Sequence, residues 1–309
     1  MLALIPTGRA PERVELAQVP DPQPADDHAL VRVEAFSLNR PDFLYLLIPN
    51  SRWRVGIDAA GVVERAAADG SGPPVGTRVL AHVPEGGGGA ALLAAPTRQV
   101  APLPDALDTT TAAALPLAGL VALRLVRAAG ALAGRRVMLT GATGGVGQYA
   151  AQLAIAAGAE VTAVTRASDP HDHLREIGAT VVQDVEAAIG RFDVLLESVG
   201  GAVGTAALGK LAHRADVLWF GAATREPLTL DFFSFFDDRE SFTLRHFVYS
   251  DVDDADDASD LAALVELAAD GRLQTTIGLC ADWSQTAHAI NQIASGAQQG
   301  KAVLTVPQS

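Results

Sequence analysis

The sequence contains a single cysteine, Cys280, among 309 residues. One cysteine excludes a disulfide within the chain and a cysteine-rich structural zinc site, and it fits a reducing compartment. Unpaired cysteines are most often small buried residues. We therefore expect Cys280 to lie buried near the C-terminal strands.

Basic residues are also scarce, with 23 Lys and Arg against 36 Asp and Glu and a net charge of −13. No cluster of basic residues offsets this charge, so DNA or RNA is a poor candidate partner. No apolar run approaches the roughly 18 residues of a membrane span, and the N-terminus lacks a basic, apolar signal core. We expect a cytoplasmic protein.

The first 112 residues have a β-rich pattern. The segment HALVRVEAFSL alternates apolar and polar residues, as a half-buried strand does. Further strand-like runs, GVVERA and GTRVLAHV, are separated by glycine and proline between Gly70 and Gly76. The four consecutive glycines Gly86–Gly89 indicate a flexible turn, because no strand-to-helix pattern surrounds them.

The pattern changes near Asp108. The segment TTTAAALPLAGLVALRLVRAAG predicts a helix that starts at Thr109–Thr111 and stops at Gly130. Short apolar runs then alternate with helices: RRVMLT, AEVTAVT, FDVLLESV and DVLWFG are expected strands. Strands this apolar are buried on both faces, which indicates an α/β fold with a parallel sheet covered by helices.

A glycine-rich turn, Thr140–Gly147, follows the strand RRVMLT and opens a helix, the context of a dinucleotide-binding fingerprint. Its glycines let the backbone come close to a pyrophosphate and let the helix pack tightly on the sheet. The helix N-terminus attracts negative charge. A plain tight turn is the alternative. The predicted cofactor-binding residues here are Ala142, which replaces the first glycine of the fingerprint, Thr143, Gly144, Gly145, Val146 and Gly147.

The next strand ends in Thr165 and Arg166. An NAD enzyme usually carries an acidic residue at this point to bind the ribose 2′-hydroxyl. No carboxylate follows this strand directly, whereas Arg166 can pair with a 2′-phosphate. The sequence therefore predicts NADPH as the cofactor, although Arg166 as a solvated surface residue remains an alternative.

Several motifs in order, VRVEAFSLNRPD, GIDAAGVV, GTRVLAH, LPLAGLVALRLV, GATGGVG, FDVLLESVGG, VLWFG and GKAVLTV, resemble the medium-chain dehydrogenase/reductase superfamily. In particular, they resemble its zinc-independent, quinone-oxidoreductase-like (zeta-crystallin-like) branch. The resemblance implies a GroES-like catalytic domain of residues 1–112 and 273–309 and a Rossmann nucleotide-binding domain of residues 113–272. It also implies an active site in the cleft between them.

Zinc enzymes of this superfamily bind a catalytic metal through cysteine, histidine and a further cysteine or acid. The matching positions here are Asn39, Ile57 and the neighbourhood of Leu115 and Pro116, which cannot ligate zinc as required. The resemblance thus implies hydride transfer without a metal. A quinone or α,β-unsaturated ketone suits this chemistry, because hydrogen-bond donors can stabilise the enolate that forms.

The family's N-x-x-D motif places Asn39 and Asp42 at the implied active site. Asn39 is a candidate hydrogen-bond donor to the substrate carbonyl or orienter of the cofactor ribose, or a loop residue bonded to its own backbone. Asp42 is expected to fix the loop, and Tyr45 is a candidate proton donor or a core tyrosine. The remaining implied cofactor contacts are Arg40, Ser198, Val199, Gly200, Gly221 and Lys301, with Lys301 near the phosphates or simply solvated.

Six of the ten phenylalanines lie between Phe232 and Phe247, which indicates a pocket wall, a subunit contact or core packing. In the family that the chain resembles, a strand just after this region often pairs edge to edge in a dimer. TLRHFVY is a candidate for that strand, so the resemblance implies a homodimer. The acidic run Asp251–Asp260 indicates a solvated loop in which Ser259 and Asp260 start a helix. The predicted protein is an NADPH-dependent quinone or enone reductase. A reductive tailoring enzyme of polyketide type and an NADPH-binding protein without turnover are the alternatives.

Overall fold

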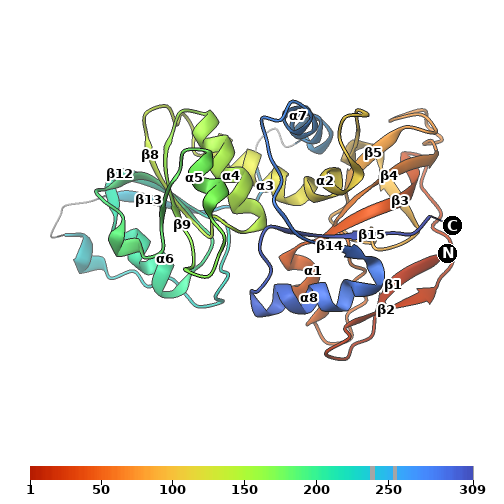
Figure 1. The fold of residues 1–309 in the computed structure, drawn as a ribbon, viewed down its shortest axis with the longest axis horizontal. Helices are drawn as coiled ribbons and strands as arrows, with labels where there is room; N and C mark the ends of the chain where they lie inside the picture. The colour runs from red at the N-terminus through yellow and green to blue at the C-terminus, as the bar shows by residue number, and fades with distance from the viewer. Residues whose placement is uncertain (237–240, 253–255, 309) are drawn as a thin grey trace. The chain divides into compact units, whose positions relative to one another are not determined.

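The computed structural model describes residues 1–236, 241–252 and 256–308. The chain divides into two compact units, residues 1–120 with 256–309 and residues 121–255. Figure 1 shows a sheet with attached helices in each unit. The predicted α/β class, with one β-rich domain and one parallel-sheet domain, is confirmed.

Unit 1, residues 1–120 and 256–309, is built on a seven-stranded sheet and a separate two-stranded sheet. The larger sheet has the order β14-β15-β3-β4-β5-β7, with β6 paired to β3, and all its pairs except β14 with β15 are antiparallel. The strands are β1 (Leu2–Pro6), β2 (Val14–Gln18), β3 (His28–Leu38), β4 (Asp58–Arg65), β5 (Arg78–His82), β6 (Leu92–Pro96), β7 (Val100–Pro102), β14 (Ile277–Asp282) and β15 (Lys301–Thr305).

The helices of unit 1 pack against this larger sheet or each other. Helix α2 contacts β3, β4 and β15, and α1 lies beside α8 (Figure 1). A core of valine, leucine, alanine and phenylalanine fills the interior. The helices are α1 (Arg40–Leu46), α2 (Thr109–Ala114), α7 (Asp257–Ala269), α8 (Thr286–Ser295) and the first part of α3 (Pro116–Ala128), with short 3-10 turns η1 (Thr97–Gln99) and η4 (Trp283–Gln285).

Unit 2, residues 121–255, is a six-stranded parallel sheet of order β10-β9-β8-β11-β12-β13. Helix α4 packs on β8 and β9, and α6 packs on β8 and β11. The elements are β8 (Arg136–Thr140), α4 (Gly145–Ala156), β9 (Glu160–Val164), α5 (Asp172–Glu176), β10 (Thr180–Val182), η2 (Val185–Ala187), β11 (Phe192–Glu197), α6 (Gly201–Leu208), β12 (Leu211–Trp219), η3 (Phe232–Phe235) and β13 (Phe242–His246).

The chain passes from one unit to the other at residues 120/121 and 255/256. The sequence predicts these domain boundaries at 112/113 and 272/273. Helix α7 accounts for the second difference, because it packs on β7 and η1 in unit 1. At Gly119 of the same unit, an added Cβ would lie 2.8 Å from a methyl carbon of Leu264 in α7. A helix that follows a parallel sheet in sequence need not cover that sheet.

The structure corrects several local predictions. Cys280 is exposed, not buried, because it lies on the outward face of the edge strand β14. The helix predicted over residues 109–130 is two helices, α2 and α3, with Pro116 starting the second. In the acidic run, residues 253–255 lie outside the described residues, and Asp256 caps α7 through the backbone N–H groups of Ala258 and Ser259.

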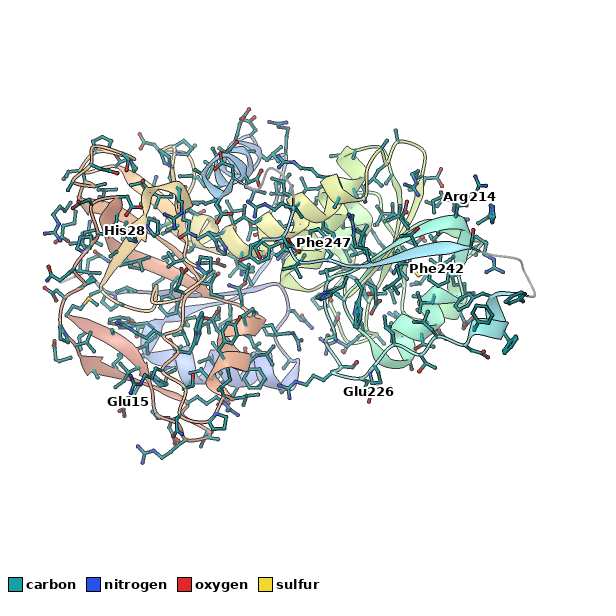
Figure 2. All side chains as sticks on the ribbon, turned by 180° about the vertical axis from the view of Figure 1, so that it is seen from behind. Glu15, His28, Arg214, Glu226, Phe242 and Phe247 are labelled. Atoms are coloured by element: carbon teal, nitrogen blue, oxygen red, sulfur yellow. The ribbon has the colours of Figure 1, made fainter. Side chains whose placement is uncertain are left out.

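The phenylalanine-rich segment serves more than one purpose. Phe247 is 5% exposed and belongs to the interior, whereas Phe232, Phe233 and Phe236 are between 60% and 75% exposed and pack on one another. Figure 2 labels Phe242, the first residue of β13, and Phe247, which directly follows β13, and this strand is at one edge of its sheet. The predicted dimer contact at this strand stays a prediction. Among the described residues, no helix is long and apolar enough to cross a membrane.

Candidate functional site

A buried ion cluster in unit 1 is centred on Asp58, which is fully buried at the start of β4. Its Oδ2 accepts hydrogen bonds from Ser37 Oγ (2.8 Å) and Asn39 Nδ2 (2.8 Å) and lies 3.2 Å from Lys301 Nζ. Lys301 Nζ also donates to Asn39 Oδ1 at 2.5 Å. The amide of Asn39 is therefore held on both sides.

The second oxygen of Asp58 faces the interior of unit 1. Asp58 Oδ1 accepts from the backbone N–H of Leu117 (2.8 Å) and lies 3.8 Å from Nδ1 of the buried His82. Burial opposes ionisation of Asp58, but the Lys301 ammonium, His82 and the hydrogen bonds outweigh it and hold the pKa well below its ordinary value. Asp58 and Lys301 thus form a buried ion pair.

Strand order explains how residues far apart in the sequence meet here. Strands β15, β3 and β4 are consecutive in the sheet, with Ala302 paired to Leu38 and Ser37 paired to Asp58. The sequence predicts that Lys301 lies near cofactor phosphates. The structure shows its contacts with Asn39 and Asp58, and the phosphate role stays a prediction. Asp58 was missed, although a carboxylate within the apolar run GIDAAGVV is a signal of a buried polar site.

Asp42 organises the loop that follows α1. It is fully buried, and its carboxylate accepts from the backbone N–H of Asn39 (2.8 Å), the backbone N–H of Gly56 (2.8 Å) and Trp53 Nε1 (3.3 Å). Burial raises the pKa of Asp42 to about 7, while these hydrogen bonds act in the opposite direction. Such contacts suit the loop-fixing role that the sequence favours.

Tyr45 lies on the exposed side of α1. Its ring is 4.5 Å from the ring of Trp53 between centroids, and the two side chains line a pocket of about 700 Å³ in unit 1. With 41% of its surface exposed, Tyr45 is accessible and not a core tyrosine. Arg40, at the start of α1, is exposed. The cofactor contact expected of Arg40 stays a prediction.

The glycine-rich turn of unit 2 has the predicted strand–turn–helix form between β8 and α4. Gly141 has φ +66°, a conformation that favours glycine. A Cβ at Gly147 would lie 2.3 Å from the carbonyl oxygen of Gly141 and 2.7 Å from Cα of Ala142. The backbone of α4 therefore approaches the turn too closely for any side chain at Gly147.

Three of the predicted cofactor-binding segments meet at the carboxyl ends of β8, β11 and β12. The Ser198 hydroxyl donates to Thr140 O at 3.1 Å, and the Ser198 backbone N–H donates to Thr140 Oγ1 at 2.9 Å. A Cβ at Gly221 would lie 3.1 Å from Cβ of Ser198. In α/β sheets, ligands bind outside this edge of the strands.

Glu197, which sequence reasoning missed, holds the loop after β11. This buried carboxylate accepts from Thr140 Oγ1 (2.6 Å), Val199 N (2.8 Å) and Gly200 N (2.5 Å). Burial raises the pKa of Glu197, and the three hydrogen bonds lower it in part. The sequence signal was an acid at the end of the apolar strand FDVLLE.

Arg166, which follows β9, is paired with a carboxylate that the sequence reasoning overlooked. Arg166 Nη2 lies 2.9 Å from Asp169 Oδ1, and Arg166 Nε donates to Asp169 Oδ2 at 3.2 Å. Thr143 of the glycine turn donates to the same Oδ2 at 2.6 Å. No carboxylate follows β9 directly, but the chain folds back after Arg166 and brings the carboxylate of Asp169 beside it.

The polar groups near Asn39 and Ile57 do not form a conventional metal site. In the ranges that the structure describes, no group of three or more His, Cys, Asp or Glu side chains is placed to hold a metal ion. Asn39 offers an amide that is bonded to Asp58 and Lys301, and Ile57 offers no ligand. The metal-free chemistry inferred from the sequence stays a prediction.

Comparison with known families matches both parts of the chain. The alcohol dehydrogenase GroES-like domain matches residues 25–105, and the family described as zinc-binding dehydrogenase matches residues 145–267. The chain is 30% identical to the mitochondrial NAD(P)H oxidoreductase RTN4IP1 of Bos taurus over 281 residues, covering 82% of this chain and 70% of that protein.

A second relative is much longer. Squalestatin tetraketide synthase of Phoma sp. (strain C2932) is 34% identical over 152 residues, which are 48% of this chain but only 6% of the synthase. Among solved structures, the quinone oxidoreductase of Escherichia coli complexed with NADPH has a TM-score of 0.86 at 20% identity, over 99% of this chain and 100% of that one. This likeness shows that the fold is shared. Together with the two family matches and the bovine relative, the motifs establish that the chain belongs to the medium-chain dehydrogenase/reductase superfamily, in its quinone-oxidoreductase-like branch.

Proposed function

We propose that the protein is an NADPH-dependent oxidoreductase that delivers hydride to an enone or a quinone without a metal. The observation that carries the proposal is the meeting of the glycine turn with Ser198 and Gly221 at the carboxyl ends of the parallel strands. The NAD(P)H oxidoreductase and quinone oxidoreductase named above support it.

The residues of unit 2 fit a dinucleotide. Gly147 packs closely on Gly141 at the start of the twelve-residue helix α4, whose first N–H groups suit a pyrophosphate. Asp169 holds the half-exposed Arg166 in place, and its planar guanidinium suits a 2′-phosphate. Burial opposes ionisation of Asp169, but hydrogen bonds from Thr143 and Arg166 prevail and keep its pKa low. When bound, the reduced nicotinamide supplies the hydride.

The residues of unit 1 supply hydrogen-bond donors and a proton. Lys301 and Asp58 fix the Asn39 amide, which has a second Nδ2 hydrogen to donate to a carbonyl oxygen. Tyr45, accessible at the pocket, is our candidate proton donor to the product enolate. Asp42 acts by fixing the loop that carries Trp53.

A second candidate function is reduction of an enoyl intermediate of polyketide type. It is favoured by the similarity to squalestatin tetraketide synthase, to which the chain is 34% identical over 152 residues. Both candidates use conjugated carbonyl substrates and differ in the size of the group attached to the carbonyl. We further propose that the protein is a cytoplasmic homodimer.

The test of the function is NADPH oxidation in the presence of a panel of quinones and enones, followed at the absorbance of the reduced nicotinamide. Arg166→Ala should raise the KM for NADPH by about tenfold to a hundredfold, the loss of a charge-assisted pair, and change the KM for NADH by less than about twofold. Arg175→Ala is the matched control, since Arg175 is an exposed arginine of the same unit.

Equal effects of Arg166→Ala on NADPH and NADH contradict the phosphate role of Arg166. A change of NADPH fluorescence on binding, with no oxidation by any member of the panel, contradicts the reductase and favours a binding protein. Stoichiometric zinc in the purified protein contradicts the metal-free mechanism.

A further inference from the structure

The pocket beside Tyr45 lies wholly within unit 1 and has a volume of about 700 Å³. Its walls combine the Tyr45–Trp53 aromatic pair with apolar side chains, among them Ile48, Leu92 and Leu93. Pockets of this size and composition hold small organic molecules, with a few polar groups that fix their orientation.

Two arginines, Arg52 and Arg54, lie on the pocket wall, and only Arg54 is partly buried. Arg54 is half-buried, and its Nε is shielded from solvent with no hydrogen-bond partner among the described residues. Burial lowers the pKa of Arg54. The other charged side chains on the wall, Arg52 and Glu85, are exposed. The charge of a partly desolvated guanidinium is unfavourable unless an opposite charge lies beside it.

The backbone that carries Arg54 is held from two sides. The N–H groups of Gly87, Gly88 and Gly89 donate to the carbonyl oxygens of Arg54, Gly56 and Val55 at 2.8 to 2.9 Å. A Cβ at Gly86 would lie 2.1 Å from Arg54 O.

From the other side, the Asp42 carboxylate accepts from Gly56 N and Trp53 Nε1. The glycine run is therefore a support for this pocket wall, and not only a flexible turn.

We propose that this pocket binds substrates that carry an anionic group, a carboxylate or a phosphate, attached to an apolar conjugated carbonyl compound, with Arg54 as the anion-binding residue. A planar guanidinium pairs with such oxyanions through two parallel hydrogen bonds, and the aromatic pair accommodates the conjugated part. The proposal rests on the proposed function, because it names the substrate class of that reductase.

The probes are trans-3-benzoylacrylate, an enone with a carboxylate, and its neutral methyl ester. Binding to the full chain is measured by calorimetry without turnover, and reduction is measured separately with NADPH. We expect the acid to bind at least tenfold more tightly than the ester. Arg54→Met should weaken binding of the acid by about tenfold or more and of the ester by less than twofold.

Arg54→Lys, which keeps the charge but not the planar fork, should give an intermediate affinity for the acid. Arg65→Met makes the same change of charge at an exposed position at the end of β4, outside the pocket lining, and should leave both affinities unchanged. Thermal unfolding of each variant identifies any loss of fold. If Arg54→Met does not fold, the affinities of Arg54→Lys for the acid and the ester provide the test.

Equal affinity for acid and ester, binding of neither probe, or an unchanged preference in Arg54→Met overturns the proposal. A carboxylate preference that depends on Arg54, without NADPH oxidation by this or any conjugated carbonyl compound, supports the anion site and overturns the reductase. Reduction of enones with no preference for the acid supports the reductase and overturns the anion site.

Discussion

Two carboxylates of unit 1, Asp42 and Asp58, are equally buried but differ in ionisation. Each is 0% exposed and accepts several hydrogen bonds. Burial dominates at Asp42 and raises its pKa to about 7, and the negative charge of Asp58 adds to the increase. At Asp58, the Lys301 ammonium 3.2 Å away reverses the effect of burial and lowers the pKa.

The difference shows what a full opposite charge contributes to a buried site. Neutral N–H donors orient Asp42 without fully replacing its lost hydration, whereas Lys301 keeps Asp58 ionised. The two sites therefore have distinct uses. The Asp58 region is a fixed charge pair that holds Asn39, and the Asp42 region is a loop anchor whose charge can change near neutral pH.

The largest expected effect comes from removing the cation. Lys301→Met leaves Asp58 buried without its charge partner and should lower the free energy of unfolding by about 3–5 kcal/mol. Urea unfolding followed by tryptophan fluorescence measures this. The double variant Asp58→Asn with Lys301→Met is the control, since it removes both charges and should regain a large part of the loss. A Lys301→Met protein as stable as the original contradicts the comparison.

The pH dependence of stability separates the two carboxylates. For Asp42, the folded pKa of about 7 exceeds the ordinary value of 3.8, so the folded protein binds the extra proton between these limits. The free energy of unfolding should therefore fall as pH rises from about 4 to 7, by up to about 1.4 kcal/mol per pH unit. Asp58, with a lowered pKa, contributes stability that is lost only as the pH falls below about 4.

Asp42→Asn has no carboxyl group to titrate and should flatten this part of the stability profile. Unfolding in urea at several pH values between 4 and 7, compared with the unchanged protein, measures the difference. An identical slope in the two proteins means that Asp42 does not titrate in this range.

The smallest effects concern single hydrogen bonds. Ser37→Ala removes one donor to Asp58 and Trp53→Phe removes one donor to Asp42, and each should cost about 0.5–1.5 kcal/mol. Only Trp53→Phe should also change the stability profile between pH 4 and 7, because the Trp53 hydrogen bond lowers the pKa of Asp42. Circular dichroism during unfolding measures both variants. If Trp53→Phe and Ser37→Ala have the same pH dependence of stability between pH 4 and 7, the Trp53 hydrogen bond does not act on the pKa of Asp42.

Features that depend on local sequence were largely predictable. The glycine turn follows from a strand, small residues and a helix in direct succession, and the structure has that order. The α/β class follows from alternating apolar runs and helices. The family was identifiable for the same reason, since its motifs lie in short continuous segments.

Features that depend on pairing across the sheet were not predictable. Asp58 and Lys301 are 243 residues apart and meet only because β15, β3 and β4 are neighbours. Asp169 reaches Arg166 through a turn after β9 that periodicity does not describe. Cys280 was expected in the interior because of its residue type, but an edge strand presents alternate residues to solvent.

The glycines that support Arg54 have a consequence for the motions of the pocket wall. Glycine loses more conformational entropy on folding than any other residue, so ordering four in succession has a large entropic cost. The hydrogen bonds from Gly87–Gly89 to residues 54–56 offset part of that cost. Because glycine has no side chain, no side-chain packing by these residues adds to that stabilisation. This wall should open locally before the surrounding sheet does, and a bound ligand that contacts Arg54 should slow amide hydrogen exchange along the turn.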